Sequence, residues 1–171
     1  MGRTGKARSK RFVIATVLCA LALTLAGCGQ AAAFLDKREE VDAYIDRREA
    51  WIERYNAILE SHDTGFIMED DPDLMAAALD EGTDAMQSLL RDAESEAVRS
   101  DELRAVHESL LNGMRLQLEA FALFERWLAE ENDELLAEGD AAIDRANEAL
   151  TEHEDALVAL AERHFIRVLL E

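Results

Sequence analysis

Apolar residues recur every three to four positions along most of this chain, and no stretch alternates apolar and polar residues with a period of two. The longer interval places apolar side chains on one face of an α-helix, whereas an interval of two is typical of a strand. Proline, which interrupts helices, occurs once, at position 72. The pattern therefore predicts an all-α protein.

Four periodic stretches follow one another along the chain with short polar breaks between them. Asp71 before Pro72, and Ser100 before Asp101 and Glu102, are typical helix starts, because such side chains cap free amides and acids suit the positive end of the helix dipole. Four helices joined by short loops predict an up-down-up-down four-helix bundle.

The boundary before the last helix has two candidate positions. Glu130-Glu131-Asn132-Asp133 is the predicted break, and Gly139 is its rival. Gly139 falls on the apolar stripe, where a small residue allows two helices to approach closely, so we place the break at the earlier position. The alternative architecture is a three-helix bundle with one long final helix. The apolar face expected for the last helix consists of Leu136, Ile143, Ala146, Leu150, Leu157, Leu160 and Val168.

The first thirty residues differ from the rest of the chain. Five basic residues and no acid precede Phe12, and an apolar run from Phe12 to Leu25 follows. A basic start and an apolar run of about 14 residues are typical of an export signal, and the run is too short to span a membrane.

The run ends in Leu25-Ala26-Gly27-Cys28, which resembles the lipobox of bacterial prolipoproteins. The resemblance implies a signal peptide over 1–27 that is removed and a lipidated Cys28. A short tether over 28–33 then leads to the helical bundle, which the periodic stretches predict over 34–171. Two or more acyl chains hold a protein stably on a membrane. Gly29 after the cysteine implies the outer membrane if the cell is Gram-negative. The resemblance covers these residues only, and we recognise no family for the rest.

The chain is strongly acidic. Five of its 18 basic residues precede Cys28 and none of its 37 acidic residues does, so the chain from Cys28 onward has a net charge of 13 − 37 = −24. Such a charge repels nucleic acid and anionic headgroups, so we expect neither as a direct partner. The expected membrane contact is the lipid anchor.

The residues that usually bind metals or cofactors are sparse. Cys19 lies in the signal and Cys28 carries the lipid, which leaves no thiol for a disulfide, a metal or a nucleophile. No histidine stands in the Glu-x-x-His motif of di-iron bundles. His107, His153 and His164 all lie on apolar stripes, which favours core or boundary positions. We therefore predict no metal and no cofactor.

Arg48 falls within the apolar face of the first helix. It is either a residue at the rim of the bundle or half of a buried ion pair that fixes the register of the helices.

The third helix carries a second apolar ridge, defined by Leu116, Leu123 and Trp127. The ridge points away from the main stripe of that helix, so either the helix is the most enclosed of the four or the ridge contacts a partner or a second copy.

Nothing in the sequence resembles a catalytic motif, so we do not expect an enzyme. The sequence predicts a lipid-anchored protein of the cell envelope, whose helical bundle acts in protein–protein interaction or in a structural role. The alternative is a small-ligand or metal-binding bundle that acts as a sensor or carrier.

Overall fold

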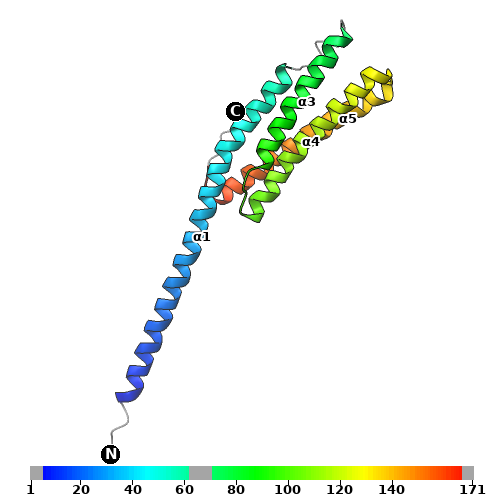
Figure 1. Cartoon of the computed structure of the whole chain (residues 1–171). Coiled ribbons are helices and arrows are strands. Elements are labelled where there is room, and N and C mark those ends of the chain that lie inside the picture. Colours follow the sequence, from blue (N-terminus) through cyan, green and yellow to red (C-terminus); the bar gives the residue numbers. More distant parts are fainter. Residues whose placement is uncertain (1–5, 62–70, 167–171) are drawn as a thin grey trace, which may run out of the picture.

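The computed structural model describes residues 6–61 and 71–166, with side chains from residue 32 onward. All regular structure in this part of the chain is helical: α1 (Lys6–Ser61), α3 (Pro72–Glu94), α4 (Asp101–Glu130) and α5 (Asp133–Arg163). Successive helices run in opposite directions (Figure 1). The predicted four-helix bundle is confirmed.

The predicted helix starts are confirmed. The Asp71 carboxylate accepts hydrogen bonds from the amides of Asp73 and Leu74, with Pro72 in the first turn of α3. The Ser100 hydroxyl accepts one from the Leu103 amide at the start of α4. These bonds satisfy amides that have no partner within their own helix.

The break between α4 and α5 lies where the sequence places it. Glu131 takes a left-handed conformation with φ 50°, which ends α4, and the Asn132 side chain accepts from the Glu134 amide to begin α5. The three-helix alternative is therefore wrong, and Gly139 lies inside α5.

Helix α1 begins well before Phe34, the residue at which the sequence predicted that the helical bundle starts. Residues 28–33, expected as a tether, continue the helix, because alanine is the strongest helix former and no proline interrupts. The N-terminal half of α1 projects beyond the other helices (Figure 1). None of the helices that the structure describes is both long and apolar enough to cross a membrane.

Helices α4 and α5 make the most extensive contact in the bundle. Their shared seam contains small buried residues, namely Gly113 of α4 and Gly139, Ala142, Ala146 and Ala149 of α5. A Cβ on Gly113 would lie 2.8 Å from the Leu150 side chain, and a Cβ on Gly139 would overlap the Phe124 ring. The absence of these side chains allows the two helices to approach closely.

The buried face of α5 differs from the face that the sequence predicted. Leu136, Ile143 and Leu150 are only partly buried, whereas Leu135, Gly139, Ala142 and Ala149 are buried. Glycine and alanine occupy much of the buried face of α5, whereas the larger Leu136, Ile143 and Leu150 pack against the core from partly buried positions, Leu150 over Gly113 of α4. Ala146, Leu157 and Leu160 are buried as expected, and Val168 lies outside the described residues.

Helix α1 presents large side chains to the bundle. Tyr44, Trp51 and Tyr55 are buried, and Ile45, Ile52, Ile58 and Leu59 pack against the same core. The contact of α1 with α3 and α5 is less extensive than that between α4 and α5. Large aromatic side chains fill the wider space between α1 and the rest of the bundle.

Replacing Gly139 with leucine tests the seam. We expect Gly139→Leu to lower the free energy of unfolding by about 1–3 kcal/mol, because the new side chain has to displace the Phe124 ring. Thermal melting followed by circular dichroism measures the loss, with Glu138→Ala, an exposed neighbour on α5, as the control. A Gly139→Leu protein as stable as the unmodified one would contradict the close approach.

Candidate functional site

A cluster of polar side chains lies in the interior where α1, α4 and α5 meet. We call Tyr44, Arg48, His107 and His153 the core polar cluster. All four side chains are buried, and the Trp51 ring lies against them, 5.7 Å from the His107 ring centroid. Buried polar groups are costly unless they are paired, so the partners of each group decide what the cluster does.

His107 has a partner on each ring nitrogen. The Tyr44 hydroxyl donates to Nδ1 at 3.1 Å, and Nε2 donates to the Ala93 carbonyl at 3.1 Å. This pairing matches the neutral tautomer with its proton on Nε2. Burial lowers the pKa of His107, more than the bond to Ala93 raises it. His107 of α4 therefore joins α1 and α3 as a neutral group.

His153 of α5 donates from Nδ1 to the Val106 carbonyl of α4 at 2.9 Å. Its Nε2 has no partner within the described part of the chain. Burial lowers the pKa of His153 to about 4, and the nearby Arg48 charge acts in the same direction. The ring is therefore neutral at pH 7 and acts as a hydrogen-bond donor between α4 and α5.

Arg48 is 7% exposed and forms an ion pair with Glu154 of α5, with Nη2 2.6 Å from Oε1. The Arg48 side chain is therefore buried and ion-paired, as the second interpretation of the sequence expected, although its partner lies at the edge of the bundle. The Glu154 side chain is 45% exposed, so the pair reaches from the interior to the edge of the bundle. Removing either partner would leave a charge uncompensated, at high cost for the buried guanidinium.

Two further buried polar contacts between helices were not predicted from the sequence. The Tyr55 hydroxyl donates to Gln117 Oε1 at 3.1 Å, and both residues are buried. Glu40 of α1 accepts from the amides of Arg99 and Ser100 at 2.6 and 3.1 Å, and so caps α4 from a neighbouring helix. Burial would raise the pKa of Glu40, but these two hydrogen bonds outweigh it and leave the pKa below its usual value. The only sequence signal was a glutamine at a buried position of α4.

The core polar cluster is suited to holding helices together rather than to a reaction. Its members are buried, which closes them to a substrate in this conformation. Both nitrogens of His107 are engaged, and no group of three or more histidine, cysteine or acidic residues within the described ranges is arranged to hold a metal ion. The third histidine of interest, His164, is buried at the end of α5, 5.4 Å from the Phe34 ring.

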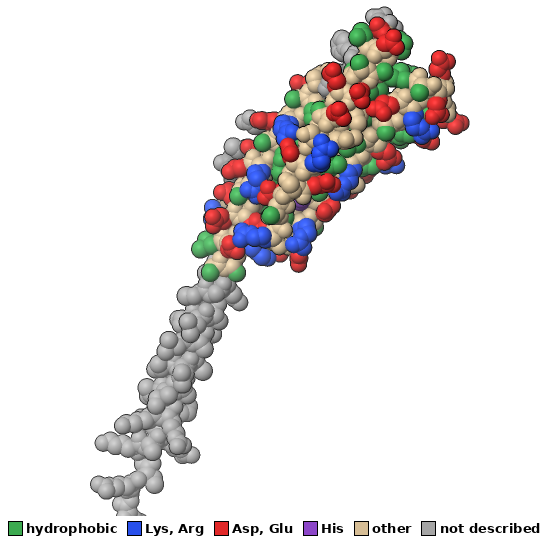
Figure 2. Space-filling model, in the orientation of Figure 1, with side chains coloured by type: hydrophobic (Ala, Val, Ile, Leu, Met, Phe, Trp, Pro, Cys, Tyr) green, Lys and Arg blue, Asp and Glu red, His purple; other side chains and the backbone are tan. Residues whose placement is uncertain are grey.

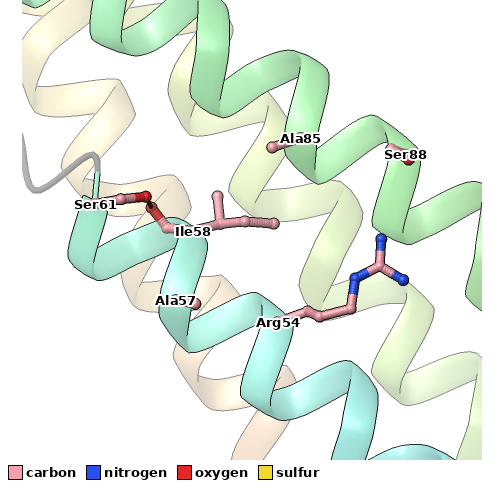
Figure 3. A pocket seen from close by; sticks show the side chains of 6 residues that line it. All are labelled: Arg54, Ala57, Ile58, Ser61, Ala85 and Ser88. Atoms are coloured by element: carbon pink, nitrogen blue, oxygen red, sulfur yellow. Dashed lines mark hydrogen bonds between the residues drawn. The ribbon is translucent and has the colours of Figure 1, made fainter.

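A groove of about 460 Å³ lies on the surface between the end of α1 and the middle of α3 (Figure 3). Small side chains leave the space, and Ile58 points into it from α1. The lining residues are Arg54, Ala57, Ile58, Ser61, Ala85 and Ser88. Arg54 is held by Asp92 at 2.6 Å, so the one charged group of the lining is already paired. The groove suits a small, largely apolar group.

The ridge of α4 is less exposed than a free contact surface would be. Leu116, Leu123 and Trp127 are all partly buried, and Leu123 and Trp127 pack against the core. The large exposed hydrophobic residues in the described part of the chain are Leu35, Leu74 and Phe165, which lie elsewhere. The role of the ridge as an interaction surface stays a prediction from its spacing.

Cys28 is part of helix α1, in the segment for which the structure describes the backbone but not the side chains. Comparisons of the chain with protein-family models, curated proteins and solved structures find no match.

The pKa of His153 predicts a pH-dependent stability. Because the pKa falls from 6.5 in the unfolded chain to about 4 in the folded one, the unfolded chain takes up a proton first as the pH falls. The stabilisation is complete above pH 6.5 and is lost progressively below it, and the loss reaches about 3 kcal/mol by the time the pH has fallen to the folded pKa.

Exchange of His153 for asparagine isolates this effect. Between pH 7 and pH 5, we expect the melting temperature of His153→Asn to fall by less than that of the unmodified protein, because asparagine can donate to the Val106 carbonyl without titrating. Leu150→Ala, which destabilises α5 but keeps His153, serves as the control and should keep the full pH dependence. Equal pH dependence in all three proteins would rule out the role of His153.

Exchange of Leu123 for glutamate tests the ridge. Because Leu123 packs against the core, we expect Leu123→Glu to lower the free energy of unfolding by about 1–3 kcal/mol. Thermal melting and light scattering of residues 29–171 give stability and oligomeric state together, with Ala122→Glu at an exposed neighbouring position as the control. A Leu123→Glu protein with unchanged melting that no longer self-associates would instead assign the ridge to an interface.

Proposed function

We propose that this chain is a lipid-anchored protein of a bacterial cell envelope, whose acidic helical bundle binds another envelope component or serves a structural role without catalysing a reaction. The observation that carries the proposal is Leu25-Ala26-Gly27-Cys28 directly after a basic start and an apolar run. The arrangement of the bundle is compatible with it, because α1, the first helix of the bundle, is also the helix that contains Cys28.

The contacts inside the bundle also favour a binding or structural role. The side chains best suited to acid–base chemistry, His107 and His153, are buried and donate to backbone carbonyls of neighbouring helices. A group used in this way stabilises the bundle and has no open approach for a substrate. The candidate partners are a second envelope protein or another copy of this chain.

A second candidate function is the binding of a small ligand. The open groove of about 460 Å³ on the surface between α1 and α3 is the observation that favours it. Its lining of small and apolar side chains suits a small apolar molecule better than a metal ion. This candidate is compatible with a lipid anchor, because a tethered bundle can also carry a ligand.

Mass spectrometry of the protein purified from a bacterial host tests both candidates. We expect a chain that begins at Cys28 and carries the mass of acyl groups, and Cys28→Ala should lose both the acyl mass and the cleavage. A Cys28→Ala protein that is still acylated and cut at the same place would refute the anchor. Native mass spectrometry of the same protein should show the mass of the bundle with no bound molecule. A bound molecule that is lost in Ala85→Leu, a change within the groove, would establish the second candidate.

A further inference from the structure

One end of the bundle carries an unusual apolar surface. Leu35 is 60% exposed and Phe165 is 79% exposed, and the Phe34 ring lies 6.1 Å from the Phe165 ring. We call Phe34, Leu35 and Phe165 the basal patch. Phe165 has a φ of 57°, a conformation that is costly for an aromatic residue. The chain thus holds a large apolar side chain in water at this end, in a strained conformation.

The basal patch lies close to the residue that would carry the lipid. Residues 28–33 are helical, so Phe34 follows Cys28 by six residues, or about 9 Å along the axis of α1. Amphipathic protein surfaces bury their apolar faces about 5–10 Å into the boundary between headgroups and acyl chains. The patch is therefore within reach of that boundary once Cys28 is anchored in it.

The charge of the bundle changes from one end to the other. Residues 34–40, 98–104 and 162–166, which surround the basal patch, have a net charge of 5 − 6 = −1. Residues 71–84 and 125–145 at the opposite end have a net charge of 2 − 13 = −11. Figure 2 shows acidic side chains over the whole visible face of the bundle, whereas the Lys and Arg side chains lie mostly over its lower and middle parts. The repulsion from anionic headgroups expected for the whole surface is therefore weakest at the basal patch.

Ion pairs balance the charge around the patch. Glu102 of α4 accepts from Lys37 of α1 at 3.2 Å and lies 4.0 Å from Arg163 of α5. Arg99 lies 3.7 Å from Asp36 and 3.9 Å from Glu40. These exposed pairs bridge the ends of α1, α4 and α5 but add little stability. The firmer connection is the buried Glu40 carboxylate, which accepts from the Arg99 and Ser100 amides and joins α1 to the start of α4 beside the patch.

The size of the patch favours a lipid surface over a second copy of the chain. Its exposed parts amount to roughly 300 Å², given that one aromatic side chain offers about 150–250 Å². Two such patches packed against each other would bury roughly 600 Å² in total, whereas a stable protein interface buries about 1,200 Å² or more over both partners. A membrane, by contrast, requires only a few apolar side chains in addition to the anchor.

We infer that the basal patch docks on the lipid surface that holds the anchor, so that Phe34, Leu35 and Phe165 enter the headgroup region and the acidic end points away from the membrane. This inference rests on the proposed lipid anchor at Cys28. It goes further in giving the bundle a defined orientation and in assigning a contact with lipid to three side chains of the folded bundle.

Spin labels on single cysteines test the inference. The mature chain has no cysteine other than Cys28, so Leu35→Cys and Phe165→Cys each introduce one free thiol for a nitroxide. Leu74→Cys is the matched control, because Leu74 is 61% exposed and lies at the opposite end, in the first turn of α3. The full-length lipidated proteins are reconstituted into vesicles of equal parts phosphatidylethanolamine and phosphatidylglycerol.

When the protein is bound to vesicles, we expect the labels at residues 35 and 165 to be less accessible to a water-soluble nickel complex than the label at residue 74. The same two labels should be more accessible to oxygen dissolved in the bilayer. The label at residue 74 should stay accessible to nickel. If the chain is acylated and floats with the vesicles, but the labels at residues 35 and 165 have the same accessibility as the label at residue 74, the docking is overturned and the anchor is not. Labels shielded from both reagents would show that protein covers the patch, and would also overturn it. A chain that is neither acylated nor floats would refute the proposed anchor, and the docking with it.

Discussion

The close approach of α4 and α5 is the constraint on which the rest of the bundle depends. Gly113 and Gly139 leave room for Leu150 and the Phe124 ring, and the alanines between them keep the seam narrow. Small side chains bury little apolar area themselves, so their contribution is to let larger neighbours pack densely on both sides. The resulting antiparallel pair is a firm platform, and α1 and α3 pack on it through larger side chains such as Trp51 and Met86.

Helix α1 is held to this platform by directional contacts as well as by apolar ones. The hydrogen bond from Tyr44 to His107, the one from Tyr55 to Gln117 and the ion pair between Arg48 and Glu154 follow one another along the helix. A shift of one helical turn would leave these buried polar groups without partners, in addition to disturbing the apolar packing of α1. The core polar cluster therefore fixes the register of α1, and this role accounts for the burial of its two histidines.

Features that depend on neighbouring residues were predictable from the sequence, and features that depend on distant ones were not. The caps at Asp71 and Ser100 and the break at Glu131 follow from local chemistry, and the structure has all three. The face of α5 was predicted only in part: Ala146, Leu157 and Leu160 are buried, whereas Leu136, Ile143 and Leu150 pack against the core from partly buried positions. Hydrophobic periodicity favours large aliphatic residues and gives little weight to the small ones buried beside them. The partner of Arg48 lies 106 residues away and that of Tyr55 62 residues away, so spacing gave no indication of either. Arg48 was nevertheless identifiable as a candidate for pairing, since a charge on an apolar face needs a partner.

The fixed register of α1 also has a consequence for the molecule as a whole. Because α1 contains both Cys28 and the buried contacts of the core polar cluster, an anchor at Cys28 would be coupled to the bundle by a continuous helix rather than by a loose linker. Helix α4 alone is about 45 Å long, so the acidic end of an upright bundle would stand several Debye lengths of about 8 Å from the headgroups. Its charge would then act on an anionic membrane only when the bundle tilts, and repulsion would oppose the tilt. The acidic end would thus help to keep the bundle upright and its far surface free for a partner.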